Sequence, residues 1–153
     1  MRKRGISNII TIIILTALTI VLAVIFFSFA RGIIGGFITY NGQNIELICY
    51  DVLFEARYSN GELYLANNGN IPIYQIKMIK FNEESHGAID LHEEPGINWP
   101  GDGLLVGGRF SGNLNIEEDV DRIIFVPVLQ GDDENGAKKL HVCGNEVGYE
   151  VLI

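Results

Sequence analysis

The chain has 153 residues, of which 48% are hydrophobic, and a formal net charge of −8 at pH 7. This length fits one compact domain of ordinary size and little more. The acidic balance argues against nucleic acid as a partner, because phosphate binding relies on clustered lysine and arginine side chains. All 19 acidic residues and 8 of the 11 basic residues lie beyond Ala30, so the composition indicates a membrane-type segment followed by a soluble domain.

The first thirty residues carry the apolar segment. Arg2, Lys3 and Arg4 precede 25 uncharged residues, Ile6 to Ala30, of which 16 are Ile, Leu, Val or Phe. A helix of this length spans roughly 37 Å at about 1.5 Å per residue, against a hydrocarbon core of about 30 Å. Its large apolar side chains favour membrane insertion by about 5 to 10 kcal/mol. The basic tip predicts a cytoplasmic N-terminus and a C-terminal domain outside the membrane.

Three interpretations of this segment compete. In a secretory signal, Ser28-Phe29-Ala30 would be the small-residue cleavage site, but the apolar run before it exceeds the usual length of about 7 to 15 residues. A permanent single-span anchor also accounts for the hydrophobicity. In the third interpretation, a short basic leader is removed and the helix is kept.

The third interpretation comes from a resemblance. Lys3-Arg4-Gly5, followed by Ile6-Ser7-Asn8-Ile9-Ile10-Thr11 and an unbroken apolar helix, resembles the class III signal of archaeal type IV pilins. Bacterial pilins have Glu at the position of Ile10, so the resemblance is to the archaeal proteins. It implies that a prepilin peptidase cuts between Gly5 and Ile6. The cut would remove the basic residues and leave the helix intact for packing against copies of itself.

Beyond the helix, which we expect over residues 6–34, Gly35-Gly36 predicts a flexible joint, and residues 35–44 are expected to form a linker. Residues 45–153 then show short β-rich runs separated by Gly, Asn and Pro, the pattern of an all-β sandwich or barrel. The runs predict strands at residues 45–58, 62–67, 72–81, 87–91, 104–106, 109–116, 122–129, 138–143 and 147–152.

Local signals within the head refine this prediction. Asn60-Gly61 predicts a tight hairpin between the first two strands, and the segment Asn67 to Pro72 predicts the next reversal. Ile45, Leu47 and Cys49 alternate in the opposite phase to Val52, Phe54 and the residues that follow, which predicts a β-bulge near Tyr50. The stretch Leu63 to Ile73 with Ile123 to Leu129 resembles the immunoglobulin-like heads of archaeal pilins. The expected fold class is therefore α+β and pilin-like.

Two cysteines, Cys49 and Cys143, allow one disulfide, and a location outside the membrane permits its oxidation. It would close a loop of about 95 residues, worth on the order of 4 kcal/mol in the chain-entropy model. Two buried free thiols are the alternative.

The sequence contains no pattern typical of a catalytic site. His86, His92, Glu93 and Glu94 match no zinc or metalloprotease spacing, and His141 stands alone, so we expect solvated loops there. The run Asp132-Asp133-Glu134-Asn135 lacks the bidentate Glu of a calcium loop and predicts a polar hairpin. Trp99, flanked by Gly and Pro, is expected either to pack on the core as a lid or to contact a neighbour.

These observations and the resemblance together imply a non-enzymatic subunit of an archaeal type IV pilus-like extracellular filament for adhesion or surface attachment, without metal or cofactor. The resemblance implies a prepilin peptidase, an assembly ATPase and a membrane platform as partners. It also implies that the precursor resides in the membrane before assembly. Two alternatives remain open: a β-sandwich binding module held on the cell surface by an uncleaved helix, and an archaellin of a motility filament.

Overall fold

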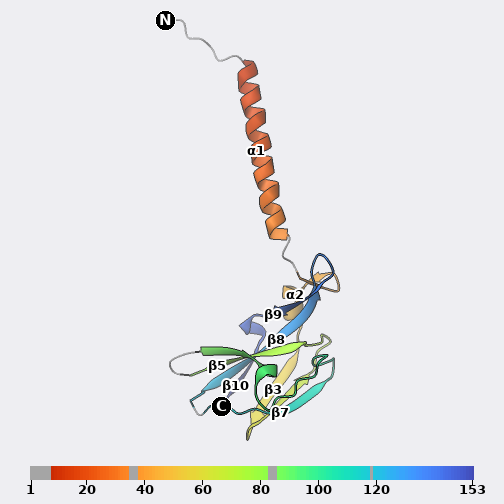
Figure 1. The fold of residues 1–153 in the computed structure, drawn as a ribbon, viewed down its shortest axis with the longest axis vertical. Helices are drawn as coiled ribbons and strands as arrows, with labels where there is room; N and C mark the ends of the chain where they lie inside the picture. Colours follow the sequence, from red (N-terminus) through yellow and green to blue (C-terminus); the bar gives the residue numbers. More distant parts are fainter. Residues whose placement is uncertain (1–7, 35–37, 83–85, 118) are drawn as a thin grey trace. The chain divides into compact units, whose positions relative to one another are not determined.

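A computed structural model describes residues 8–34, 38–82, 86–117 and 119–153 (Figure 1). The chain divides into two compact units, Met1–Phe37 and Ile38–Ile153, and each is considered by itself. The expected leader of residues 1–5, the Gly5–Ile6 bond and the Gly35-Gly36 joint lie outside the described residues.

The first unit is one continuous helix, α1 (Asn8–Ile34). Every large hydrophobic side chain from Ile10 to Phe29 is at least half exposed, and these residues form a helix long and apolar enough to cross a membrane. Two hydroxyl groups inside it bond to the helix backbone: Thr16 donates to the carbonyls of Ile12 and Ile13 at 3.0 Å, and Thr19 donates to that of Thr16 at 2.8 Å. Because such bonds satisfy the hydroxyls, these polar residues cost little in an apolar surrounding.

The second unit, the head, is built from two antiparallel sheets. The smaller sheet has the order β3-β4-β7, and the larger has the order β2-β1-β8-β5-β6, with β9 and β10 also paired to β8. The strands of the smaller sheet are β3 (Phe54–Ser59), β4 (Glu62–Asn67) and β7 (Arg109–Asn113). Those of the larger sheet are β1 (Thr39–Tyr40), β2 (Gln43–Asn44), β5 (Gln75–Phe81), β6 (His86–Asp90), β8 (Arg122–Asp132), β9 (Lys138–Val142) and β10 (Tyr149–Leu152).

Strand β8 organises the larger sheet. On one side it pairs with β5, and on the other it pairs first with β10 and then, further along, with β9. Between β9 and β10 the chain leaves the ladder for residues 143–148, which include the short 3₁₀ helix η2 (Asn145–Val147). The backbone N–H of Cys143 donates to the carbonyl of Pro127 at 3.0 Å. The backbone N and C=O of one strand residue point to the same side of the strand. The nitrogen of Pro127 therefore also faces the interruption between β9 and β10, where no ladder bond needs an N–H donor.

One hydrophobic cluster among the described residues joins the two sheets. From the larger sheet it takes Ile76, Met78 and Phe125, and from the smaller sheet Leu63 and Leu65, all completely buried. In β4 and β5 these residues alternate with more exposed ones, as expected where one face of a strand is buried, whereas β8 is buried on both sides from Phe125 to Leu129. Alternation therefore explains why β4 and β5 form strands with one face in this cluster.

The segment after β6 closes the edge of the core between β5 and β7. It begins with the 3₁₀ helix η1 (Leu91–Glu93), whose Leu91 is completely buried. Lys80 and Glu94 form a largely buried ion pair at 2.7 Å. The half-buried Trp99 donates its indole N–H to the carbonyl of Tyr74 at 2.9 Å and packs on Phe110 with ring centroids 5.1 Å apart. The prediction of Trp99 as a lid on the core is thus confirmed.

The Asn60-Gly61 hairpin is confirmed. Asn60 and Gly61 have φ of 53° and 82°, and Ser59 pairs with Glu62 across them. The chain also reverses at the Asn67 to Pro72 segment. There it passes from β4 of the smaller sheet to β5 of the larger sheet, and these two strands are not paired with each other. There the side chain of Asn67, only 1% exposed, donates to the carbonyls of Ile71 and Leu104 at 2.9 and 3.0 Å.

The prediction of a strand from residue 45 was wrong. Ile45–Cys49 forms a short helix, α2, capped by the side chain of Asn44, which accepts the N–H of Glu46 at 3.0 Å. Ile45, Ile48 and Cys49 are buried at helical spacing, so the change of phase marks a helix and not a bulge at Tyr50. The expected strand at 104–106 is reduced to one bridge between Leu104 and Ile73.

The head begins earlier than the expected boundary at residue 45. Residues 39–44, assigned to the linker from sequence, form the hairpin β1–β2 and belong to the second unit. Asn41 and Gly42 have φ of 51° and 80°, the same turn chemistry as Asn60-Gly61.

Candidate functional site

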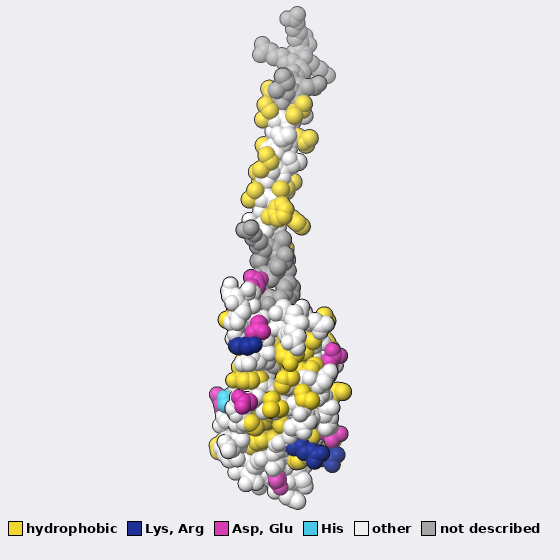
Figure 2. Space-filling model, turned by 90° about the vertical axis from the view of Figure 1, so that its right-hand side faces the viewer, with side chains coloured by type: hydrophobic (Ala, Val, Ile, Leu, Met, Phe, Trp, Pro, Cys, Tyr) yellow, Lys and Arg dark blue, Asp and Glu magenta, His cyan; other side chains and the backbone are white. Residues whose placement is uncertain are grey.

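Two features of the described residues stand out as candidate interaction sites: the surface of α1 and a groove beside the disulfide. Figure 2 shows hydrophobic side chains gathered along the helix, and hydrophobic and acidic side chains mixed on one face of the head. A soluble helix has an apolar stripe and a polar face. Because α1 is apolar on all sides from Ile10 to Phe29, it needs lipid or other protein around its whole circumference.

Cys49 and Cys143 form the disulfide expected from the sequence, with Cα atoms 5.6 Å apart. Cys49 is the last residue of α2 rather than part of a strand, and Cys143 follows β9 directly, in the interruption of the ladder. Both are only 3% exposed. The bond therefore fixes α2, which lies near the start of the head sequence, to the end of β9 in the larger sheet.

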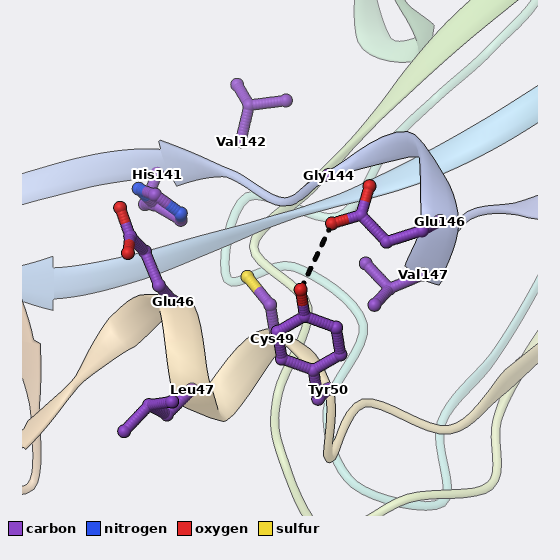
Figure 3. Close-up of a pocket in the computed structure, with 9 residues that line it drawn as sticks. All are labelled: Glu46, Leu47, Cys49, Tyr50, His141, Val142, Gly144, Glu146 and Val147. Atoms are coloured by element: carbon purple, nitrogen blue, oxygen red, sulfur yellow. Dashed lines mark hydrogen bonds between the residues drawn. The ribbon is translucent and has the colours of Figure 1, made fainter.

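A groove with a volume of about 360 Å³ is lined in part by Cys49 of this disulfide. Figure 3 shows the residues around it. Its lining comes from α2, the end of β9 and η2, and consists of Glu46, Leu47, Cys49, Tyr50, His141, Val142, Gly144, Glu146 and Val147. The Tyr50 hydroxyl donates to Glu146 Oε1 at 3.3 Å. Leu47 and Tyr50 are 66% and 63% exposed, so apolar walls stand beside two carboxylates.

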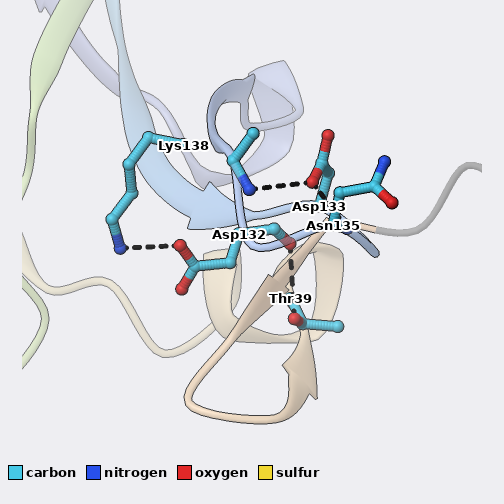
Figure 4. Close-up of polar contacts among 6 residues, drawn as sticks. Thr39, Asp132, Asp133, Asn135 and Lys138 are labelled. Carbon is cyan, nitrogen blue, oxygen red and sulfur yellow. Dashed lines mark hydrogen bonds and ion pairs between the residues drawn. The ribbon is translucent and has the colours of Figure 1, made fainter.

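The acidic run near residue 132 forms a polar hairpin, as predicted (Figure 4). Asp132 pairs with Lys138 at 2.7 Å, and its backbone carbonyl accepts the hydroxyl of Thr39 at 3.3 Å. The Asp133 carboxylate accepts the backbone N–H of Ala137 at 2.9 Å and that of Asn135 at 2.8 Å. These two bonds, in that order, and then Lys139 hold the pKa of Asp133 below its usual range. Both carboxylates are thus engaged in holding the turn.

The remaining residues considered from sequence are dispersed. His86 stacks on Phe81 with ring centroids 6.0 Å apart, and Glu94 is taken up by Lys80. His92 and Glu93 are exposed in η1, while His141 lies in β9. Among the described residues, no three His, Cys, Asp or Glu side chains are placed to hold a metal ion.

Sequence reasoning did not find the groove. Its two carboxylates, Glu46 and Glu146, are 100 positions apart, and neither belongs to a motif. Only the pairing of the two cysteines could have placed their neighbours together. In comparisons with protein-family models, curated proteins and solved structures, nothing matches this chain.

Proposed function

We propose that this chain is the structural subunit of an extracellular filament of the archaeal type IV pilus kind. The observation that carries the proposal is α1: a helix without any charge from Ile10 to Phe29, apolar on every side, joined to a separately folded and disulfide-bonded head. Released from lipid, such a helix is stable only if protein covers its whole surface. Packing against identical helices provides that cover.

The proposal includes the processing and assembly that the N-terminal residues imply. A prepilin peptidase cuts between Gly5 and Ile6, and an assembly ATPase and a membrane platform move the processed helix from the membrane into the filament. The two antiparallel sheets of the head support an immunoglobulin-like sandwich as the fold of a sheath domain. We regard that fold class as part of the proposal.

The test is the mass of the N-terminal peptide in protein from membranes and from the sheared, sedimenting fraction of the cell surface. A mature start at Ile6 in the sheared fraction supports processing and assembly together. An intact N-terminus found only in membranes would instead support the second candidate, a surface binding module held by a permanent anchor. That candidate is favoured by the fact that α1 alone is long enough to span.

A charge within the helix gives an independent test. Ile14 is 63% exposed in the middle of the apolar segment, and an aspartate there costs about 2.5 to 3.5 kcal/mol in lipid. It would also leave an unpaired carboxylate in a helix bundle. We expect Ile14→Asp to abolish filaments, whereas Ile14→Leu leaves them unchanged. Normal filaments from Ile14→Asp, seen by electron microscopy, would refute packing through α1.

A further inference from the structure

Among the described residues of the head, ion pairing accounts for every basic side chain except one. The head contains 19 acidic and seven basic residues. Among the residues that the structure describes, six of the seven basic side chains form an ion pair with a carboxylate of the same head. The exception is Arg109, the first residue of β7, which is exposed and lies opposite Ala66 of β4. In so acidic a head, a guanidinium that forms no ion pair with the described carboxylates is available to a carboxylate of another molecule.

Arg109 is accompanied by two exposed aliphatic side chains. The turn just before it presents Leu105 and Val106, which are 59% and 57% exposed. The turn is held firmly: Gly108 N–H donates to the carbonyl of Leu105 at 2.8 Å, and two further backbone bonds, of 2.9 and 3.0 Å, tie it to Asn67. We call Leu105, Val106 and Arg109 the knob. It is a fixed projection with an apolar part and one positive charge.

The groove beside the disulfide has the complementary properties. Glu46 and Glu146 are exposed, and neither forms an ion pair within the described residues; Glu146 has only the Tyr50 hydroxyl as a partner. Leu47, Tyr50 and Val142, from 45% to 66% exposed, supply apolar walls. The disulfide fixes α2 to the end of β9. A rigid acidic groove with apolar walls therefore matches a rigid basic knob with apolar side chains.

The knob and the groove of one head are separate surfaces. Leu104, next to the knob, bridges to Ile73 on the β5 side of β8, whereas the groove is built on β9 and η2 on the other side of β8. No residue of the knob lines the groove. A contact between two such different surfaces does not close on itself as a two-fold dimer does. Repeated from copy to copy, it gives a ring if the rotation closes and an open, helical series if it does not, and the helical series is the one that fits a filament.

We propose that the knob of one head docks in the groove of a neighbouring copy, with Arg109 between Glu46 and Glu146. The occupant of the groove is thus a second copy of this chain. This inference rests on the proposed filament, because exposed ion pairs are worth only up to about 1 kcal/mol. Helices packed in a filament core hold the heads at high effective concentration, which makes so weak a contact effective.

Charge exchange tests the contact. We expect Arg109→Glu to lower the yield of sheared filaments by about tenfold or more, because it places three carboxylates together. Glu46→Arg alone should lower it similarly, and the double exchange Arg109→Glu with Glu46→Arg should recover at least half of the wild-type yield. Arg57→Glu is the matched control: Arg57 is an exposed cation of the same sheet, with the same change in net charge, but it already pairs with Glu55.

A photo-crosslinker identifies directly the residues that the knob contacts. With p-benzoyl-phenylalanine in place of Val106, irradiated filaments should yield crosslinked dimers whose second peptide contains residues 46–50 or 141–147. Unchanged Trp99 fluorescence melting of each variant would show that the head folds normally. The inference is overturned if Arg109→Glu behaves like Arg57→Glu, if the double exchange gives no recovery, or if the crosslinks lie elsewhere. Each of these results leaves filaments in the wild type; wild-type cells without filaments would overturn the proposed function as well.

Discussion

Removing the disulfide should destabilise the head by a large part of its stability. The perturbation is Cys49→Ala together with Cys143→Ala. The cysteines are 94 positions apart, and in the chain-entropy model a closed loop of this length is worth about 4.7 kcal/mol, because the bond restricts the unfolded chain. At about 2.1 cal/mol/K of unfolding entropy per residue, the head from Ile38 to Ile153 should lose roughly 20 °C in Tm.

Trp99 provides the assay. It is the only tryptophan of the chain and packs against Phe110 in the head, so its fluorescence reports head unfolding in the full chain in detergent. The wild type measured in a thiol reductant is the control, since it loses the bond but keeps both sulfur atoms. It should melt between the oxidised wild type and the double variant. A double variant within about 5 °C of the wild type would show that the loop constraint contributes little.

The remaining predictions concern single side chains of the head. Asn67→Ala should cost about 3 kcal/mol in urea unfolding, because the Ile71 carbonyl loses the Asn67 amide as donor, the Leu104 carbonyl keeps only the N–H of Ile73, and the N–H of Gly69 loses its acceptor; a cost below about 1 kcal/mol would contradict this role. Gly103→Ala should cost about 3 kcal/mol for two reasons: a Cβ there would overlap the carbonyl oxygen of Ile73, and Gly103 has a φ of 75°, which strains any residue with a side chain. Gly136→Ala, at the same φ but with open space around it, should cost only about 1 kcal/mol, and equal costs would refute the steric argument. Asp133→Ala should lower the Tm at pH 7. Because the folded pKa of Asp133 is depressed, the difference from the wild type should be full above about pH 4 and shrink as the pH falls through that pKa; a difference that persists unchanged in strong acid would be evidence against it.

The strands best predicted from sequence are those marked by turn chemistry. A tight two-residue hairpin turn requires positive φ at two successive residues, and Asn-Gly adopts this conformation at little cost, as Asn60 and Gly61 do. β3 and β4 followed directly from that signal, together with the alternation on either side. The same dipeptide at Asn41-Gly42 was overlooked because the flanking strands have only two residues each, too few for alternation to show.

Helix α2 could not be distinguished from a strand by its pattern. Five residues complete less than two helical turns, so Ile45, Leu47 and Cys49 fit a period of two as well as Ile45, Ile48 and Cys49 fit a helix. The available signal was local: Asn44 as N-cap, with Glu46 in the first turn. The groove was unpredictable for a different reason, since it exists only where the disulfide brings α2 to the end of β9.

The disulfide also determines how the head carries mechanical load. A pull on the chain at Ile38 first meets the eleven residues before Cys49, which could extend by roughly 38 Å if they were peeled away. At Cys49 the covalent path divides, and part of the tension passes through sulfur to Cys143, beside the central strand β8, without travelling along β3. Tension is thereby delivered to the segment between β9 and β10, and because both strands pair with β8, their ladders must shear together before the head yields. The disulfide at this point therefore limits how far the start of the head can extend under load.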